Sequence, residues 1–170
     1  MYKYRLAKYD PKLRDTNGKY LKKDWTSFDQ IGKFFENKKF TLEIYEKYEQ
    51  KYILVIMEFL NINKINKLVV TNLEKNFFQQ HKNKVDNENL KELYADVVEG
   101  QIVDIMNIKA ILQSVLRGYI WFKFLTKDEK NFIHFGWDMY VYFGSDRSLS
   151  IGSFNLHNLF LEEVEQSPYE

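Results

Sequence analysis

Hydrophobic positions divide the chain into stretches with a helical period and stretches with a period of two. Residues 42–62 carry apolar side chains at three- and four-residue steps, which predicts a long amphipathic helix capped by Thr41. A second stripe of this kind predicts a helix over 107–118. Alternating or continuous β-prone residues predict strands over 2–9 and 67–73.

The most strand-like region is predicted to be a β-hairpin. Residues 119–126 and 132–144 flank a polar five-residue connection, and the second stretch reads as one long strand. Because strand side chains alternate, that strand should have two different faces. The expected core face is Ile133, Phe135, Trp137, Met139, Val141 and Phe143. The opposite, half-polar and aromatic face is His134, Gly136, Asp138, Tyr140 and Tyr142.

The remaining segments predict shorter elements. They are a helical turn over 25–32, a polar loop over 74–88, a short helix from 86 or 87 to 97, another from 146 or 148 to about 158, and an acidic strand over 159–165. This order predicts a single α+β domain, with a mostly antiparallel sheet and helices packed on one face. Within it, residues 1–40 are expected to form an irregular basic and aromatic arm, and residues 41–170 the main body.

Composition narrows the class of protein. Hydrophobic residues make up 45% of the chain and aromatic residues 17%, which is enough for a packed core and argues against disorder. The chain contains no cysteine, which excludes disulfides, thiolate metal sites and a cysteine nucleophile. No apolar run has the length of a membrane span or the character of a signal peptide. We therefore expect a cytoplasmic protein without a membrane partner.

Charge is unevenly distributed along the chain. Residues 1–40 hold 11 Lys and Arg against 5 Asp and Glu, whereas residues 128–170 hold 2 against 8. A basic beginning and an acidic end indicate either two separate binding surfaces or two segments that neutralise each other in the fold. Both interpretations stay open from the sequence.

Motifs for common chemistries are missing from the sequence. The glycines form neither a dinucleotide-binding nor a P-loop pattern. The histidines at 81, 134 and 157 lack the spacing of metal ligands, and the serines between 145 and 153 are typical of turns and helix caps. We therefore predict no catalytic residues, no metal site and no cofactor.

Two alternatives involve nucleic acid. His134 and Asp138 share a predicted strand face, so His134 could serve an RNA- or nucleotide-handling enzyme such as a ribonuclease as an acid or base. The two side chains would lie about 13 Å apart on a straight strand, which is too far for direct contact. The 1–40 arm mixes Lys with Tyr, Trp and Phe, a composition suited to single-stranded nucleic acid. Acidic residues interrupt that run, which makes nucleic acid the less favoured partner.

The aromatic face of the predicted hairpin favours protein binding. Tyr and Trp supply large contact areas at little cost in rotamer entropy and are enriched at interface hot spots. The predicted partner-binding residues are Trp121, Lys123, His134, Asp138, Tyr140 and Tyr142.

Several segments carry a resemblance to known proteins. They are Tyr4-Arg-Leu-Ala-Lys-Tyr-Asp-Pro11, Trp25-Thr-Ser27, His134-Phe-Gly-Trp-Asp-Met-Tyr140 and Leu159-Phe-Leu-Glu-Glu163. With these segments the chain resembles small uncharacterised proteins of AT-rich bacteria, which are similar in style to toxin-immunity proteins. The resemblance implies a cytoplasmic immunity or inhibitor protein without catalytic activity, which masks the active site of one protein toxin. An acidic end would suit a basic nuclease toxin. A structural or regulatory subunit of a larger assembly is the third possibility.

Overall fold

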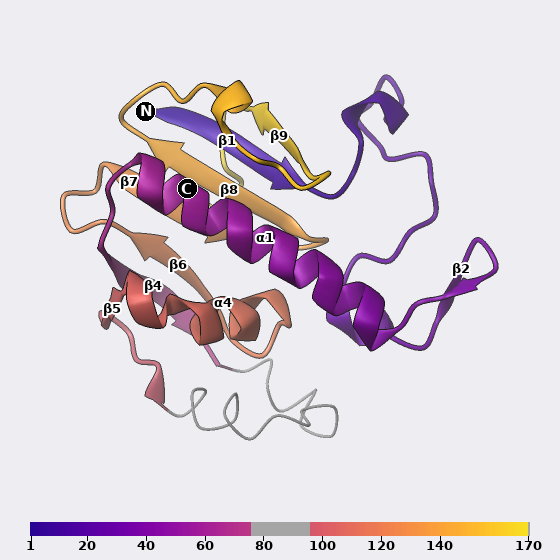
Figure 1. The fold of residues 1–170 in the computed structure, drawn as a ribbon, viewed down its shortest axis with the longest axis horizontal. Coiled ribbons are helices and arrows are strands. Elements are labelled where there is room, and N and C mark those ends of the chain that lie inside the picture. Colours follow the sequence, from indigo (N-terminus) through magenta and orange to yellow (C-terminus); the bar gives the residue numbers. More distant parts are fainter. Residues whose placement is uncertain (76–95, 170) are drawn as a thin grey trace.

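Two helices, α1 (Leu42–Ile62) and α4 (Ile108–Leu116), lie on the same face of a seven-stranded sheet in the computed structural model (Figure 1). The structure describes residues 1–75 and 96–169. The strands follow the order β5-β4-β6-β7-β8-β1-β9, and each pairing between them is antiparallel. The predicted class, α+β with a mostly antiparallel sheet and helices on one face, is confirmed.

The strands of the main sheet are short. They are β1 (Tyr2–Ala7), β4 (Lys67–Glu74), β5 (Ile102–Asp104), β6 (Trp121–Leu125), β7 (Asn131–Phe135), β8 (Tyr140–Ser145) and β9 (Phe160–Glu163). A small hairpin before α1 is formed by β2 (Phe34–Phe35) and β3 (Lys38–Lys39). Turns of 3₁₀ helix cover Pro11–Leu13, Phe28–Gln30, Ile105–Asn107 and Ile151–Ser153.

The long first helix has the predicted bounds and cap. The Thr41 hydroxyl accepts a hydrogen bond from the Ile44 amide at 3.3 Å, which satisfies one of the amides left open at a helix N-terminus. The buried side of α1 packs on the sheet, where the Phe59 ring stacks on Phe143 with centroids 4.5 Å apart. The helix predicted over 107–118 and the strand over 67–73 are confirmed to within two residues.

The single long strand predicted over 132–144 is wrong, because the chain turns back at 136–139. The Gly136 amide donates to the Tyr140 carbonyl at 2.8 Å and closes a second hairpin between β7 and β8. The predicted faces nevertheless hold within the two strands: Ile133, Phe135, Val141 and Phe143 are buried on the helix side. Trp137 does not belong to that core face, since it lies in the turn and is exposed.

Other predictions have mixed outcomes. The helix predicted from 146 or 148 to about 158 is reduced to the 3₁₀ turn Ile151–Ser153. The final strand is shorter than predicted, and the turn over 25–32 holds the 3₁₀ turn Phe28–Gln30. The loop over 74–88 and the helix ending at 97 fall mostly outside the described residues. β1, the first strand of the expected arm, pairs with both β8 and β9 and is therefore an interior strand of the main sheet.

Candidate protein-interaction site

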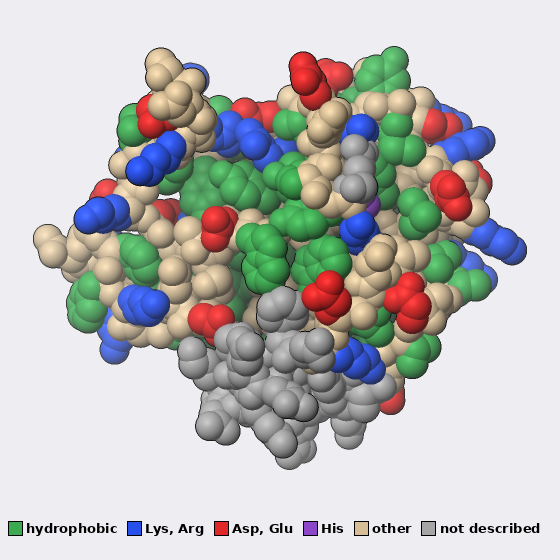
Figure 2. Space-filling view, turned by 180° about the vertical axis from the view of Figure 1, so that it is seen from behind, with side chains coloured by type: hydrophobic (Ala, Val, Ile, Leu, Met, Phe, Trp, Pro, Cys, Tyr) green, Lys and Arg blue, Asp and Glu red, His purple; other side chains and the backbone are tan. Residues whose placement is uncertain are grey.

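The face of the sheet opposite the helices carries one polar row across six strands. Residues directly opposite each other in an antiparallel pair place their side chains on the same face. The registers therefore align Thr71, Lys123, His134, Tyr142, Arg5 and Glu162, in order from β4 to β9. Figure 2 shows the molecule from this side, with hydrophobic side chains gathered centrally and charged ones around them.

The C-terminal segment covers the middle of this row. The Ser167 hydroxyl lies 2.9 Å from Nδ1 of His134, and Lys123 donates to the Tyr169 carbonyl. The Tyr169 ring packs against Tyr142, with centroids 6.0 Å apart, and also against the Trp121 ring at 5.7 Å. The hairpin face expected to be open to a partner is thus largely covered by residues 167–169 of the same chain.

His134 lies beneath this cover. Its side chain is 6% exposed, and its ring stacks on Phe132 with centroids 4.0 Å apart. Phe132 in turn lies over Gly144, where an added Cβ would come within 2.0 Å of a carbon of the Phe132 ring. The imidazole is therefore part of a packed layer between the sheet and the C-terminal segment.

Charges from the two ends of the chain meet at the β9 side of the row. Glu162 accepts hydrogen bonds from Arg5 at 3.2 Å and from Arg14 at 2.9 Å. Burial raises the pKa of Glu162, but the hydrogen bonds and charges of Arg14 and Arg5 outweigh burial and hold the pKa below its ordinary value. Part of the basic arm is thus neutralised by the acidic end.

The turn between β7 and β8 exposes a tryptophan on a constrained backbone. Asp138 and Met139 both have φ of 60°, as the central residues of a type I′ turn require. The Met139 side chain is buried, and its carbonyl accepts a hydrogen bond from the buried Tyr52 hydroxyl at 2.5 Å. These contacts keep Met139 in a left-handed conformation that costs a non-glycine residue about 1 kcal/mol or more. Trp137, directly before them, is 59% exposed.

An apolar crevice of about 110 Å³ lies beside this turn. It is lined mainly by the β7–β8 turn, Phe28 and its neighbours, and the segment that follows α4. Trp121 forms part of the wall and is held there by a hydrogen bond from its Nε1 to the Phe135 carbonyl at 2.7 Å. Asp29 and Asp138 bring carboxylates to the lining.

A buried ion pair supports the opposite wall of the crevice. Arg117 donates to both carboxylate oxygens of Glu49, through Nε at 2.7 Å and through a terminal nitrogen at 2.8 Å. The hydrogen bonds to Glu49 raise the pKa of Arg117, even though burial alone would lower it. The guanidinium carbon also lies over the Phe28 ring, 5.4 Å from its centroid. These contacts hold the Arg117 side chain in place.

The structure separates the six predicted partner-binding residues into two groups. Trp121, Asp138 and Tyr140 line the crevice. Lys123, His134 and Tyr142 lie on the row beneath or beside the C-terminal segment. The Arg5 guanidinium lies over the Tyr140 ring, 5.3 Å from its centroid, and Asp138 is the one exposed residue of the six.

Sequence reasoning missed Trp137 as part of this region, and it named Arg117 only as a possible supplement to His134 and Asp138, without its partner Glu49. Trp137 was assigned to the core because it continues the alternation of the strand. A usable signal was present, since Gly136 and Asp138 flank Trp137 and both residue types are frequent in turns. Nothing in the sequence links Arg117 to Glu49, because their contact depends on how α1 and the end of α4 pack.

Among residues 1–75 and 96–169, no group of three or more His, Asp or Glu residues is placed to hold a metal ion. None of the helices in this part of the chain combines the length and the apolar character needed to cross a bilayer.

Comparisons with known proteins do not assign a family. None of the protein-family models, curated proteins or solved structures compared with this chain matches it. The resemblance to immunity-type proteins therefore stays a prediction, and the function has to be argued from the geometry of the chain.

Proposed function

We propose that this chain is a non-catalytic protein-binding module, an immunity-type inhibitor that binds a bacterial toxin in the cytoplasm and masks its active site. The binding surface is the β7–β8 turn with the adjoining crevice. The observation that carries the proposal is the position of Trp137, which is 59% exposed at the tip of a constrained turn beside an apolar crevice. Tryptophan is among the residues enriched at interface hot spots, and an apolar recess beside it can take up a side chain of the partner.

The crevice suits one apolar side chain of a partner. Its volume of about 110 Å³ is below the roughly 300 Å³ at which small-molecule sites begin. Asp138 is exposed beside the opening, so a basic residue next to the inserted side chain would be attracted to it. A basic toxin, such as a nuclease, is the partner that this arrangement favours.

The burial of His134 favours this proposal over a ribonuclease. A general acid or base must come within hydrogen-bond reach of its substrate. The His134 imidazole is instead enclosed by Phe132 and Ser167. Asp138, the other member of the enzymatic alternative, lies in the turn, outside the strands that carry His134 and Tyr142.

The test is inhibition of a toxin encoded beside this gene. The toxin and this protein are purified separately, and the affinity and the residual toxin activity are measured by titration. Trp137→Ala should weaken binding by at least about 2 kcal/mol, the size of a hot-spot truncation, while the melting temperature stays nearly constant because the side chain is mostly exposed. Asp138→Lys should slow association and make it less sensitive to salt.

Met106→Ala provides a matched control. Met106 is another large hydrophobic residue, 86% exposed, in the 3₁₀ turn before α4 and outside the lining of the crevice. Its removal should leave affinity unchanged. Equal binding by wild type and Trp137→Ala would reject the proposed surface. A ribonuclease activity of the pure protein that His134→Ala abolishes without unfolding it would reject the non-catalytic function.

A further inference from the structure

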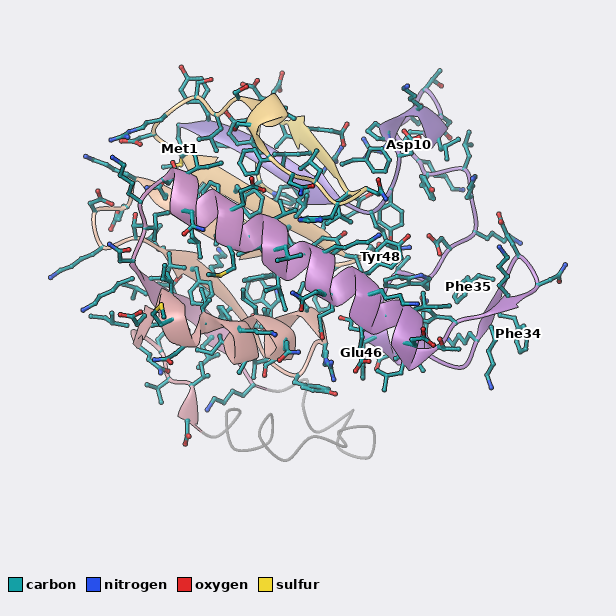
Figure 3. All side chains as sticks on the ribbon, in the orientation of Figure 1. Met1, Asp10, Phe34, Phe35, Glu46 and Tyr48 are labelled. Atoms are coloured by element: carbon teal, nitrogen blue, oxygen red, sulfur yellow. The ribbon has the colours of Figure 1, made fainter. Side chains whose placement is uncertain are left out.

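A second recess lies between the loops that follow β1 and the first half of α1. This hollow encloses about 460 Å³. Figure 3 shows Phe35 of the β2–β3 hairpin and Tyr48 of α1 in this region. Its lining is aromatic and basic: Lys8, Tyr20, Lys22, Lys23, Asp24, Trp25, Phe35, Glu36, Lys38, Phe40, Ile44 and Tyr48.

Lys8 and Asp24 neutralise each other at the base of the hollow. The Lys8 side chain is 1% exposed, and its ammonium group donates to Asp24 while lying 3.9 Å from the centroid of Trp25. Asp24 also accepts a hydrogen bond from the Trp25 amide at 2.8 Å, so both of its oxygens are engaged. Burial lowers the pKa of Lys8, against the opposing effect of Asp24. This pair contributes no net charge toward a ligand.

The charged residues at the rim of the hollow therefore determine the net charge that a ligand meets. Lys22, Lys23 and Lys38 are exposed at the rim, and Glu36 is the one acidic residue among the lining residues besides Asp24. The excess of positive charge favours an anion. Tyr20, Phe35 and Tyr48 are each half-buried, so parts of their rings form an apolar wall below the lysines.

We propose that this hollow binds a nucleotide unit, with the phosphate at Lys22, Lys23 and Lys38 and the base against the wall formed by Tyr20 and Phe35. The volume of about 460 Å³ falls within the roughly 300–1,000 Å³ of small-molecule sites. Cationic side chains above aromatic rings are the combination that holds the phosphate and the base of single-stranded nucleic acid. The ligand is either a free nucleotide or one unit of a single strand, which share this chemistry.

Titration calorimetry of the full chain with three probes tests the proposal. The probes are inorganic phosphate, adenosine monophosphate and a short single-stranded oligodeoxythymidylate. Adenosine monophosphate should bind more tightly than phosphate, because its base adds contact with the aromatic wall. If the oligonucleotide binds best and its affinity falls with salt, at a logarithmic slope of about 0.7 for each phosphate that is contacted, the ligand is a single strand. If it binds no better than the monophosphate, the ligand is a free nucleotide.

Charge reversals inside and outside the hollow distinguish a specific binding site from general electrostatic attraction to a basic segment. Lys22→Glu with Lys23→Glu should weaken binding at least about tenfold and lower the salt slope for the oligonucleotide. Lys12→Glu with Lys33→Glu changes the charge of the same segment equally at exposed positions outside the lining, and should change affinity less than about twofold.

The aromatic wall is tested by Phe35→Ser, which should weaken binding of adenosine monophosphate while leaving that of phosphate unchanged. Phe35 lies in the small β2–β3 hairpin, outside the main sheet, but it packs at the edge of the core against Phe40, so thermal unfolding of the variant must show that the fold is kept. The proposal is overturned if neither nucleotide probe binds saturably, or if both double lysine variants weaken binding equally.

Discussion

The Ser167 hydroxyl lies 2.9 Å from Nδ1 of His134, a contact that joins the C-terminal segment to the middle of the sheet. Ser167 is 4% exposed and also accepts a hydrogen bond from the Tyr169 amide at 3.3 Å. The segment thus takes the place that a partner was expected to occupy. It leaves the β7–β8 turn, at the end of the same hairpin, as the surface open to other molecules.

Removing the Tyr169 ring should loosen this cover. Tyr169→Ala deletes ring contacts with Trp121 and Tyr142 as well as the hydrogen bond from the Trp137 amide, and should destabilise the fold by about 1–3 kcal/mol. Tyr169→Phe loses only the hydrogen bond and should cost about 1 kcal/mol. Urea denaturation followed by tryptophan fluorescence measures both. Equal stability of Tyr169→Ala and wild type would show that the cover contributes nothing.

Breaking the buried ion pair beside the crevice should be more costly. Arg117→Met leaves the Glu49 carboxylate, 4% exposed, without its main cation and should reduce the free energy of unfolding by about 3–5 kcal/mol. Adding Glu49→Gln should restore part of that loss, because the remaining buried group is then neutral. Lys47→Met, which removes an exposed ion pair with Glu43 on the same helix, is the control and should leave the melting temperature nearly unchanged.

Gly144 should tolerate no side chain. An added methyl group would overlap the buried Phe132 ring, so Gly144→Ala should destabilise by about 1–3 kcal/mol through displacement of that ring and of the stacked His134. Gly152→Ala is the matched control, since its nearest neighbour would be the Ser150 hydroxyl at 3.9 Å, and should change stability by less than about 0.5 kcal/mol. Thermal unfolding of the two variants provides the comparison. If both have the wild-type melting temperature, the Phe132 ring moves aside freely.

Stability should fall steeply at alkaline pH. Burial raises the pKa of Tyr45 and of Tyr52 well above the ordinary value of 10.0, so these hydroxyls stay protonated in the folded state and ionise in the unfolded state. The unfolded state then binds fewer protons, and each such tyrosine lowers the free energy of unfolding by about 1.4 kcal/mol per pH unit above pH 10. Lys8, whose pKa burial lowers, acts in the opposite direction but is one group against several tyrosines, since burial also raises the pKa of Tyr9 and of Tyr48. Tyr52→Phe should make the decline shallower, and denaturation between pH 9 and about 11.5 measures the slope.

How far the sequence predicts this fold depends on whether the signals are local. The bounds of α1 were predictable because the helical period and the Thr41 cap lie within the segment itself. The β7–β8 turn was hidden for a geometric reason. Phe135 pairs with Val141 and His134 with Tyr142. Odd-numbered residues of β7 are therefore paired with odd-numbered residues of β8, and both sets lie on the same face of the sheet. A hairpin of this register preserves the alternation through the turn, and periodicity alone cannot reveal it.

The candidate site was less predictable than the fold. The aromatic residues of β6 and β8 were found because alternation places them on one face. Their covering by Ser167 and Tyr169 was not, since it depends on where a segment that follows β9 returns to the sheet. The hollow beside Lys8 likewise depends on long-range packing, although most of the lysine and aromatic residues that line it belong to the 1–40 arm.

The interior position of β1 determines when the sheet can be completed during synthesis. β1 begins at Tyr2, yet its two partner strands begin at Tyr140 and Phe160. The ribosome therefore releases this strand before either neighbour is made, and its pairing must wait until β8 and β9 have emerged. Such late, long-range pairing slows folding and exposes the nascent strand to incorrect association.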